Sequence, residues 1–365
     1  MSYFRENIEK MAGYEPGFQP KSTDVVKLNT NENPYPASPK VFEAIKNITP
    51  ENLRRYPQPS SDSFREAAAE IFNVKSENII CTNGGDELLD MAIRAICDEN
   101  RPLAYPTPTY SLYPVLAQIQ NCPAIEIPFD SEFNLPAKLA SAGAALTILC
   151  NPNAPSGTFI SKQEIAQLSQ EIKGVLLIDE AYVDFAEDNC LDLVKKHANV
   201  IILRSMSKGY SLAGLRFGFG IANENLIAGL NKTKDSYNVD AIAIAAATAA
   251  IKDQAYFKQN VEKVKAERKR LTAELTELGF EVMPSRTNFV FAKSVKTRAI
   301  DIYDKLKENN IYVRYWAYPD IKDNLRISIG TPEQNDKLID ELKKITAQVR
   351  QPGSAELSSA CFCRR

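Results

Sequence analysis

The 365-residue sequence is poor in histidine, because His197 is the only one. This scarcity argues against mechanisms that need a positioned imidazole, such as a Ser-His-Asp triad or a His-rich metal site. His197 follows two lysines at the end of a helical stretch, where a solvated cationic side chain is favourable. We therefore expect no metal site, and we expect a lysine, a tyrosine or a carboxylate to carry protons.

The sequence also lacks long apolar runs and an excess of either charge. No run reaches the length of a transmembrane helix, and the first residues lack the apolar region of a signal peptide. The net charge of −2 gives no basic footprint for nucleic acid or a membrane surface. The seven cysteines are scattered, and only Cys361 and Cys363 lie close together. We expect a protein of the reducing cytoplasm that binds neither nucleic acid nor membrane.

What the sequence does contain is an alternation of short apolar runs with helical stretches. The runs that predict strands are 25–28, 79–82, 102–105, 124–129, 146–150, 175–178 and 200–203. The stretches that predict helices are 39–46, 61–72, 88–96, 161–172 and the alanine-rich region 222–252. This alternation predicts an α/β fold with a mostly parallel sheet flanked by helices.

The last third of the chain predicts a smaller α+β domain. A long amphipathic helix over 255–278 ends at Gly279, which suits a helix C-terminus. The elements predicted after it are strands at 289–292, 311–314 and 325–330 and helices at 299–309 and 332–349. We therefore predict an N-terminal arm (1–30), a large domain (31–252), a small domain (253–350) and a disordered polar tail (351–365).

Residues suited to a phosphorylated aldehyde cofactor follow the predicted strand at 200–203. A lysine at a strand end, here Lys208, can form a Schiff base with an aldehyde. Ser205, Ser207 and Arg216 suit phosphate oxygens, because hydroxyls and a guanidinium group donate hydrogen bonds to them. Taken alone, this segment is more often an exposed lysine in a Ser/Gly loop, and only the other motifs favour a cofactor site.

Four other predicted strands end in residues of a similar kind. Gly84 and Gly85 open a helix whose free N–H groups suit an anion. Tyr110 suits stacking on a planar ring, Asn153 lies in a stiff Pro/Asn turn, and Asp179 needs a partner for a buried charge. A tight turn, core packing or a helix cap explains each motif alone. A parallel sheet brings all these strand ends to one edge, which favours a shared site.

Arg314 and Arg326 lie on or beside predicted strands of the small domain. Two arginines there suggest an anionic group on the substrate, with surface salt bridges as the alternative.

Together and in this order, the motifs resemble the fold-type I pyridoxal-phosphate aminotransferases over residues 1 to about 350. The resemblance rests on segments 28–36 (LNTNENPYP), 55–57 (RYP), 82–87 (TNGGDE), 108–110 (PTY), 151–157, 179–182 (DEAY), 205–218 and 325–331 (LRISIGT). It is strongest for the branch that moves an amino group between L-histidinol phosphate and 2-oxoglutarate in histidine biosynthesis. Aromatic aminotransferases and threonine-phosphate decarboxylases share the scaffold, and a non-catalytic cofactor-binding regulator is a remote alternative.

The resemblance implies pyridoxal 5'-phosphate as cofactor and a role for each motif. Lys208 would carry the cofactor and move the proton, while Asp179 would keep the ring nitrogen protonated. Tyr182 would hydrogen-bond the phenolic oxygen of the ring, and Tyr110 would stack on the ring. The residues implied for the cofactor phosphate are Gly84, Gly85, Asp86, Ser205, Ser207, Arg216 and, from the other subunit of a homodimer, Tyr56. The residues implied for the substrate are Tyr14, Asn31, Arg314 and Arg326.

One position departs from the family pattern. Ala154 stands where the family has an asparagine that contacts the ring oxygen, and Ser156 replaces a threonine. Two alternatives follow: Asn153 takes over the contact, or Tyr182 acts alone. Losing one neutral hydrogen bond costs on the order of 1 kcal/mol, so we expect tuning rather than inactivation.

Overall fold

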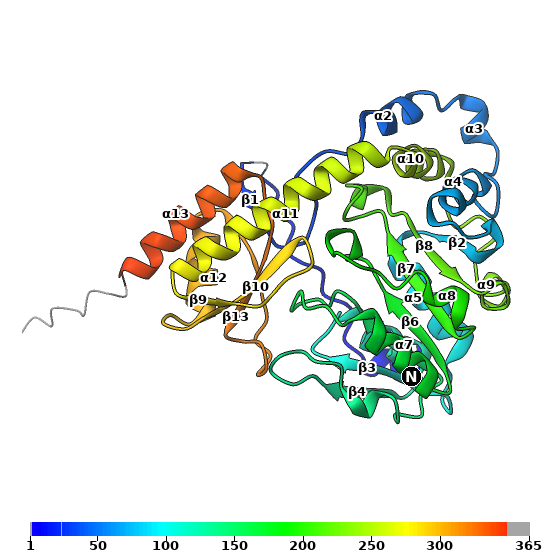
Figure 1. Ribbon diagram of the computed structural model, residues 1–365, viewed down its shortest axis with the longest axis horizontal. Helices are drawn as coiled ribbons and strands as arrows, with labels where there is room; N and C mark the ends of the chain where they lie inside the picture. Colours follow the sequence, from blue (N-terminus) through cyan, green and yellow to red (C-terminus); the bar gives the residue numbers. More distant parts are fainter. Residues whose placement is uncertain (1, 23, 349–365) are drawn as a thin grey trace, which may run out of the picture.

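The computed structural model describes residues 2–22 and 24–348, which form two parts joined by the long helix α11 (Gln254–Glu277) (Figure 1). The predicted disordered tail, with Cys361 and Cys363, lies outside these residues. Within the described ranges, no helix has the length and apolar character needed to cross a bilayer.

The larger part is built on a seven-stranded sheet with the order β2-β8-β7-β6-β5-β3-β4. Its strands are β2 (Ile79–Thr82), β3 (Leu103–Thr107), β4 (Ala124–Pro128), β5 (Leu146–Cys150), β6 (Val175–Asp179), β7 (Val200–Ser205) and β8 (Gly218–Ala222). Only β8 is antiparallel to its neighbours β2 and β7. Because β8 is antiparallel to both of its neighbours, β2 runs in the same direction as β7. The predicted α/β class is therefore confirmed, and five of the predicted strand ends share one edge.

Helices cover both faces of this sheet, which explains why its central strands are mostly apolar and buried. In β6, Leu176 and Ile178 enter one core with α4, α7, α8 and α10, whereas Leu177 enters the opposite core with α5, α6 and α9. These helices are α4 (Asp62–Phe72), α5 (Gly84–Ile96), α6 (Leu112–Gln120), α7 (Lys162–Glu171), α8 (Leu193–Lys196), α9 (Glu224–Asn231) and α10 (Ala241–Lys252). The helices that precede them in the chain are α1 (Glu6–Lys10), α2 (Pro39–Lys46) and α3 (Pro50–Arg54).

The smaller part has a four-stranded antiparallel sheet with the order β12-β13-β10-β9. Its strands are β9 (Phe280–Val282), β10 (Phe289–Ser294), β12 (Arg314–Tyr315) and β13 (Asn324–Ser328), and its helices after α11 are α12 (Ala299–Glu308) and α13 (Pro332–Gln348). A third apolar core lies between this sheet and helices α11, α12 and α13.

The segment that precedes the large domain packs with the small domain. Strand β1 (Val26–Lys27) pairs in parallel with β11 (Ile311–Tyr312). Val26 and Leu28 lie in the small-domain core. Part of the segment expected to be an N-terminal arm therefore packs with the small domain, while the predicted domain boundaries stay a prediction.

The region 222–252, predicted to be helical, holds two helices separated by the non-helical residues 232–240. Ala222 ends strand β8, and α9 and α10 follow as separate helices. Strand β8 was not predicted because it contains glycine at positions 218 and 220, and glycine is unfavourable in strands. These glycines are required by close contacts: a Cβ at Gly218 would lie 2.6 Å from the carbonyl carbon of Gly84, and one at Gly220 would lie 2.8 Å from Leu88.

Candidate active site

Two adjoining cavities lie at the carboxyl ends of the parallel strands. The inner cavity has a volume of about 280 Å³ and is lined by residues that include Asp179, Ser205, Ser207 and Arg216. The outer cavity, of about 560 Å³, extends to the small domain. The residues that line both are Thr30, Asp86, Tyr110, Tyr182 and Lys208. The predicted Schiff-base lysine thus lies where the two cavities meet.

Lys208 lies in the turn that follows β7, and few polar groups lie near its amine. Among the described residues, the hydrogen-bond partner of the Nζ atom is the carbonyl oxygen of Thr30, at 3.4 Å, and the atom lies 5.6 Å from the centre of the Tyr182 ring. Burial lowers the pKa of Lys208 to about 8, and the positive charge of Arg326 acts in the same direction. A sizeable fraction of this amine is therefore neutral near pH 8, as a nucleophile or base requires.

The backbone around Lys208 is held from several sides. Asn33 Nδ2 donates to the carbonyl oxygen of Lys208 at 3.0 Å. The next residue, Gly209, leaves no room for a side chain, because a Cβ there would overlap Asp184 Oδ2 and lie 2.7 Å from Phe257. These contacts fix the direction in which the lysine leaves the turn.

Asp179 is a buried carboxylate at the end of β6. Its Oδ2 accepts a hydrogen bond from the Tyr113 hydroxyl at 2.7 Å, and its Oδ1 accepts one from the Ala181 N–H at 3.0 Å. Burial raises the pKa of Asp179 to about 6, while the Tyr113 hydrogen bond opposes this rise. No cationic side chain pairs with it among the described residues, so a protonated ring nitrogen in the inner cavity would suit it.

Sequence reasoning missed Tyr113, although a signal existed. It lies three residues after Tyr110, in the first turn of α6, and Tyr110 lies in the turn just before that helix. A spacing of three residues in a turn can bring two side chains to one side of the chain. The two rings meet edge to face, with centres 5.6 Å apart. Tyr110 lines both cavities, and Tyr113 lies behind it against Asp179.

Asn31 and Tyr182 connect the chain's beginning to the large domain. Asn31 Nδ2 donates to the Tyr182 hydroxyl at 3.0 Å, and its Oδ1 accepts from Ser328 Oγ at 2.9 Å. Burial raises the pKa of Tyr182 to about 12, so the phenol is protonated at neutral pH. Ser328 was not expected from the sequence, since a serine within an apolar strand gives no signal of its own.

The inner cavity contains a cradle for an anion. The first turn of the 13-residue helix α5 faces Arg216, whose Nη2 donates to Asp86 Oδ2 at 3.0 Å. Gly84 has a φ of +78°, and a Cβ there would lie only 2.7 Å from Arg216 Nη2. Ser205 and Ser207 line the same cavity. Free N–H groups at a helix start, hydroxyls and a guanidinium group are the donors that a phosphate group prefers.

Arg314 and Arg326 line the outer cavity together with Tyr14. Burial lowers the pKa of Arg326, which is nevertheless charged at neutral pH. Neither arginine has a carboxylate within 4.0 Å among the described residues. The alternative of surface salt bridges is therefore wrong. An anion in the outer cavity would meet two uncompensated guanidinium groups.

Asn153 lines neither cavity, and Tyr56, which is expected to act from the other subunit, lies away from both cavities of its own chain. Asn153 accepts from Thr109 Oγ1 and donates to Ser156 Oγ, both at 2.9 Å, so its amide joins its own turn to the loop after β3. Ala154, not Asn153, lines the outer cavity. Tyr56 is 81% exposed and stacks on Tyr237, with ring centres 4.4 Å apart. Within a single chain, this tyrosine does not reach the anion cradle.

The remaining residues fit pyridoxal 5'-phosphate. Lys208 supplies an amine for the aldehyde, Asp179 a buried carboxylate for the ring nitrogen, and Tyr110 an aromatic ring for the planar face. The cradle at Arg216 suits the phosphate, and only glycine at position 84 leaves it open.

Comparisons with known proteins agree with this reading. The family described as aminotransferase class I and II matches residues 23–342. Histidinol-phosphate aminotransferase 1 of Trichormus variabilis is 49% identical, over 94% of this chain and 99% of its own length. The histidinol-phosphate aminotransferase of Citrifermentans bemidjiense is 45% identical, over 94% and 99%.

Solved structures show the same fold. A histidinol-phosphate aminotransferase from Sinorhizobium meliloti, in complex with pyridoxal-5'-phosphate, gives a TM-score of 0.87 at 24% identity, covering 96% of this chain and 99% of that one. An L-threonine-O-3-phosphate decarboxylase from Porphyromonas gingivalis gives 0.76 at 23% identity, covering 88% and 99%. At these identities the likeness concerns the fold alone.

Proposed function

The chain belongs to the class I and II aminotransferase family, and on this premise we propose that it is a pyridoxal-phosphate-dependent histidinol-phosphate aminotransferase. The reaction moves an amino group from L-histidinol phosphate to 2-oxoglutarate, giving imidazole-acetol phosphate and L-glutamate in histidine biosynthesis. One observation carries the proposal: a buried amine, Lys208, stands between an anion cradle and a cavity with two unpaired arginines. The near full-length relatives at 45–49% identity support this substrate.

Each residue then has a task. Pyridoxal 5'-phosphate, when bound, supplies an aldehyde for the amino group and a ring that withdraws electrons from the substrate carbon. Lys208 accepts the proton from that carbon at its Nζ and returns it, which its lowered pKa of about 8 favours. Asp179 would hold the positive charge of the ring nitrogen, and Tyr182 would donate a hydrogen bond to the ring oxygen.

Arg314 and Arg326 hold the anionic end of each substrate in turn. A guanidinium group can donate two parallel hydrogen bonds to a phosphate or to a carboxylate. The same pair therefore serves L-histidinol phosphate in one half-reaction and 2-oxoglutarate in the other. Tyr14, which also lines the outer cavity, and Asn31, through its bond to Tyr182, complete the substrate side.

We also propose a homodimer in the cytoplasm. The exposed stack of Tyr56 on Tyr237 offers an aromatic surface that suits a second copy of the chain, whose active site Tyr56 would complete. Sedimentation of the purified protein tests the dimer. Five buried free cysteines support a reducing compartment.

An absorbance spectrum of the cofactor-loaded protein tests the reaction. L-histidinol phosphate alone should replace the visible band of the bound cofactor by a near-ultraviolet band, and 2-oxoglutarate should restore the visible band. L-tyrosine, L-phenylalanine and L-threonine phosphate serve as matched comparisons. A response to an aromatic amino acid but not to histidinol phosphate would move the assignment to an aromatic aminotransferase. Carbon dioxide release from threonine phosphate would indicate the decarboxylase.

A further inference from the structure

We propose that Trp316 is a positioning residue that holds Arg314 and Arg326 ready for the substrate anion. It is the only tryptophan of the chain, and it lines the outer cavity beside both arginines. The proposal deepens the proposed function and rests on it for the identity of the anion.

The strand register places the two arginines directly opposite each other. Arg314 on β12 pairs with Arg326 on β13 in the antiparallel sheet. Side chains of directly opposed residues point to the same face, and like charges in that arrangement repel. Something must therefore offset the repulsion for both guanidinium groups to stay in one cavity.

Trp316, one residue beyond β12, supplies that compensation. The guanidinium carbon of Arg314 lies 5.1 Å from the indole ring centre, and that of Arg326 lies 5.0 Å from it. Both distances are within the range of cation–π attraction. Arg326 also lies 5.3 Å from the centre of the Phe289 ring. The indole is thus the one aromatic group that contacts both arginines among the described residues.

An aromatic partner has a consequence that a carboxylate would not have. A carboxylate would occupy the N–H groups that an arriving phosphate needs, whereas a ring contacts the guanidinium face and leaves its edge free. The observed hydrogen bonds agree: Arg326 Nη2 donates to the Asn29 carbonyl at 3.0 Å, and its buried Nε has no partner. Arg314 makes only a 3.5 Å contact to the Glu15 carbonyl. Donors therefore remain available for an anion.

The single tryptophan makes the proposal testable without the reaction. In cofactor-free protein, titration with inorganic phosphate should change the Trp316 emission in a saturable way. In Arg326→Gln, the phosphate concentration that gives half of the full response should be at least about tenfold higher, because the substitution removes one of the two charges. Arg216→Gln, which alters the cofactor cradle, should leave it unchanged. A response lost in Arg216→Gln, or no response at all in the parent protein, would overturn the proposal.

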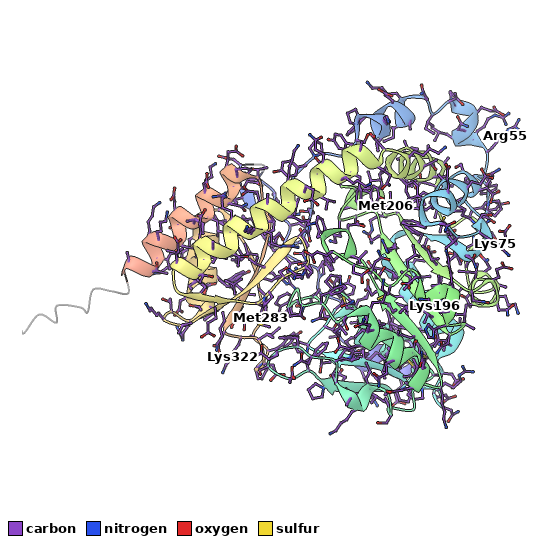
Figure 2. The ribbon with its side chains drawn as sticks, in the orientation of Figure 1. Arg55, Lys75, Lys196, Met206, Met283 and Lys322 are labelled. Atoms are coloured by element: carbon purple, nitrogen blue, oxygen red, sulfur yellow. The ribbon has the colours of Figure 1, made fainter. Side chains whose placement is uncertain are left out.

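Steady-state kinetics of Trp316→Leu and Trp316→Phe provide the second readout. Trp316→Leu should raise KM for histidinol phosphate and for 2-oxoglutarate about tenfold each, with kcat within about twofold, because ground-state and transition-state binding suffer equally. Trp316→Phe keeps a ring face and should recover most of the loss. The matched control is Lys322→Gln, in the loop between β12 and β13 (Figure 2), which removes an exposed charge that lines neither cavity.

The outcomes separate this proposal from the proposed function. Unchanged KM in a folded Trp316→Leu, or a fall in kcat alone, contradicts the positioning role. If Trp316→Leu does not fold, as its far-ultraviolet circular dichroism would show, the phosphate titration of the parent protein decides. A protein that ignores histidinol phosphate but shows the phosphate response would refute the proposed substrate and leave the role of Trp316 standing.

Discussion

The hydroxyl of Tyr113 donates a 2.7 Å hydrogen bond to Oδ2 of Asp179, and both groups are buried. This bond favours the ionised form of a carboxylate whose burial favours the neutral form. The two effects together set the pKa of Asp179 at about 6.

Tyr113→Phe should therefore shift the pH dependence of cofactor binding. Binding needs ionised Asp179, so affinity for pyridoxal 5'-phosphate should fall as the pH drops through about 6 in the parent protein. Without the hydrogen bond, the pKa of Asp179 rises further, and the fall should begin about one pH unit higher. Titration with the cofactor at several pH values, followed by absorbance, measures this. Identical pH profiles for the two proteins would contradict the argument.

Lys208→Ala should lower turnover by at least about 10³-fold, because the substrate carbon loses its proton acceptor. Rates of both half-reactions, measured separately by absorbance, check this. Lys208→Arg is a matched control that keeps the charge, but its guanidinium group does not lose a proton near neutral pH. It should be as slow as Lys208→Ala. Appreciable activity in either variant would remove Lys208 from the mechanism.

Gly209→Ala should disturb the turn that aims Lys208. The added methyl group would overlap Asp184 Oδ2 and press on Phe257, and such overpacking costs about 1–3 kcal/mol. Gly214→Ala is the control within the same loop, because its Cβ would meet nothing within 4 Å. Urea denaturation of both variants compares the free energies of unfolding. The same loss of stability in both would show that the contact with Asp184 is not the cause.

Ala154→Asn should strengthen cofactor binding. Ala154 lines the outer cavity, so an amide there can donate to the ring oxygen and add about 1 kcal/mol, or roughly fivefold in affinity. Asn153→Ala should instead lower stability without a direct loss of affinity, since its amide bonds Thr109 and Ser156. Cofactor dissociation constants and thermal melting of both variants test this pair. Weaker cofactor binding in Asn153→Ala with unchanged melting would restore Asn153 as a ligand.

The sequence by itself determined the fold class and most of the inner cavity. Strands β5, β6 and β7 are mostly apolar until their last residues because they are buried on both faces, and this pattern is local to the chain. Each such strand ends where the chain can become polar again, so Asp179 and Lys208 could be singled out without coordinates. Parallel strands then bring these ends to one edge whatever the details of packing.

Tertiary structure decided what depends on distant neighbours. Strand β8 packs close to helix α5, and this packing requires glycine at positions 218 and 220. Glycines do not predict a strand, so β8 could not be predicted from the sequence. The amide of Asn153 bonds Ser156 in its own turn and Thr109 in the loop after β3, instead of lining a cavity. Trp316 beside the arginine pair gave no signal in the sequence, and the spacing of Tyr113 from Tyr110 did not show that its hydroxyl reaches Asp179, since an aromatic residue's role depends on what packs against it.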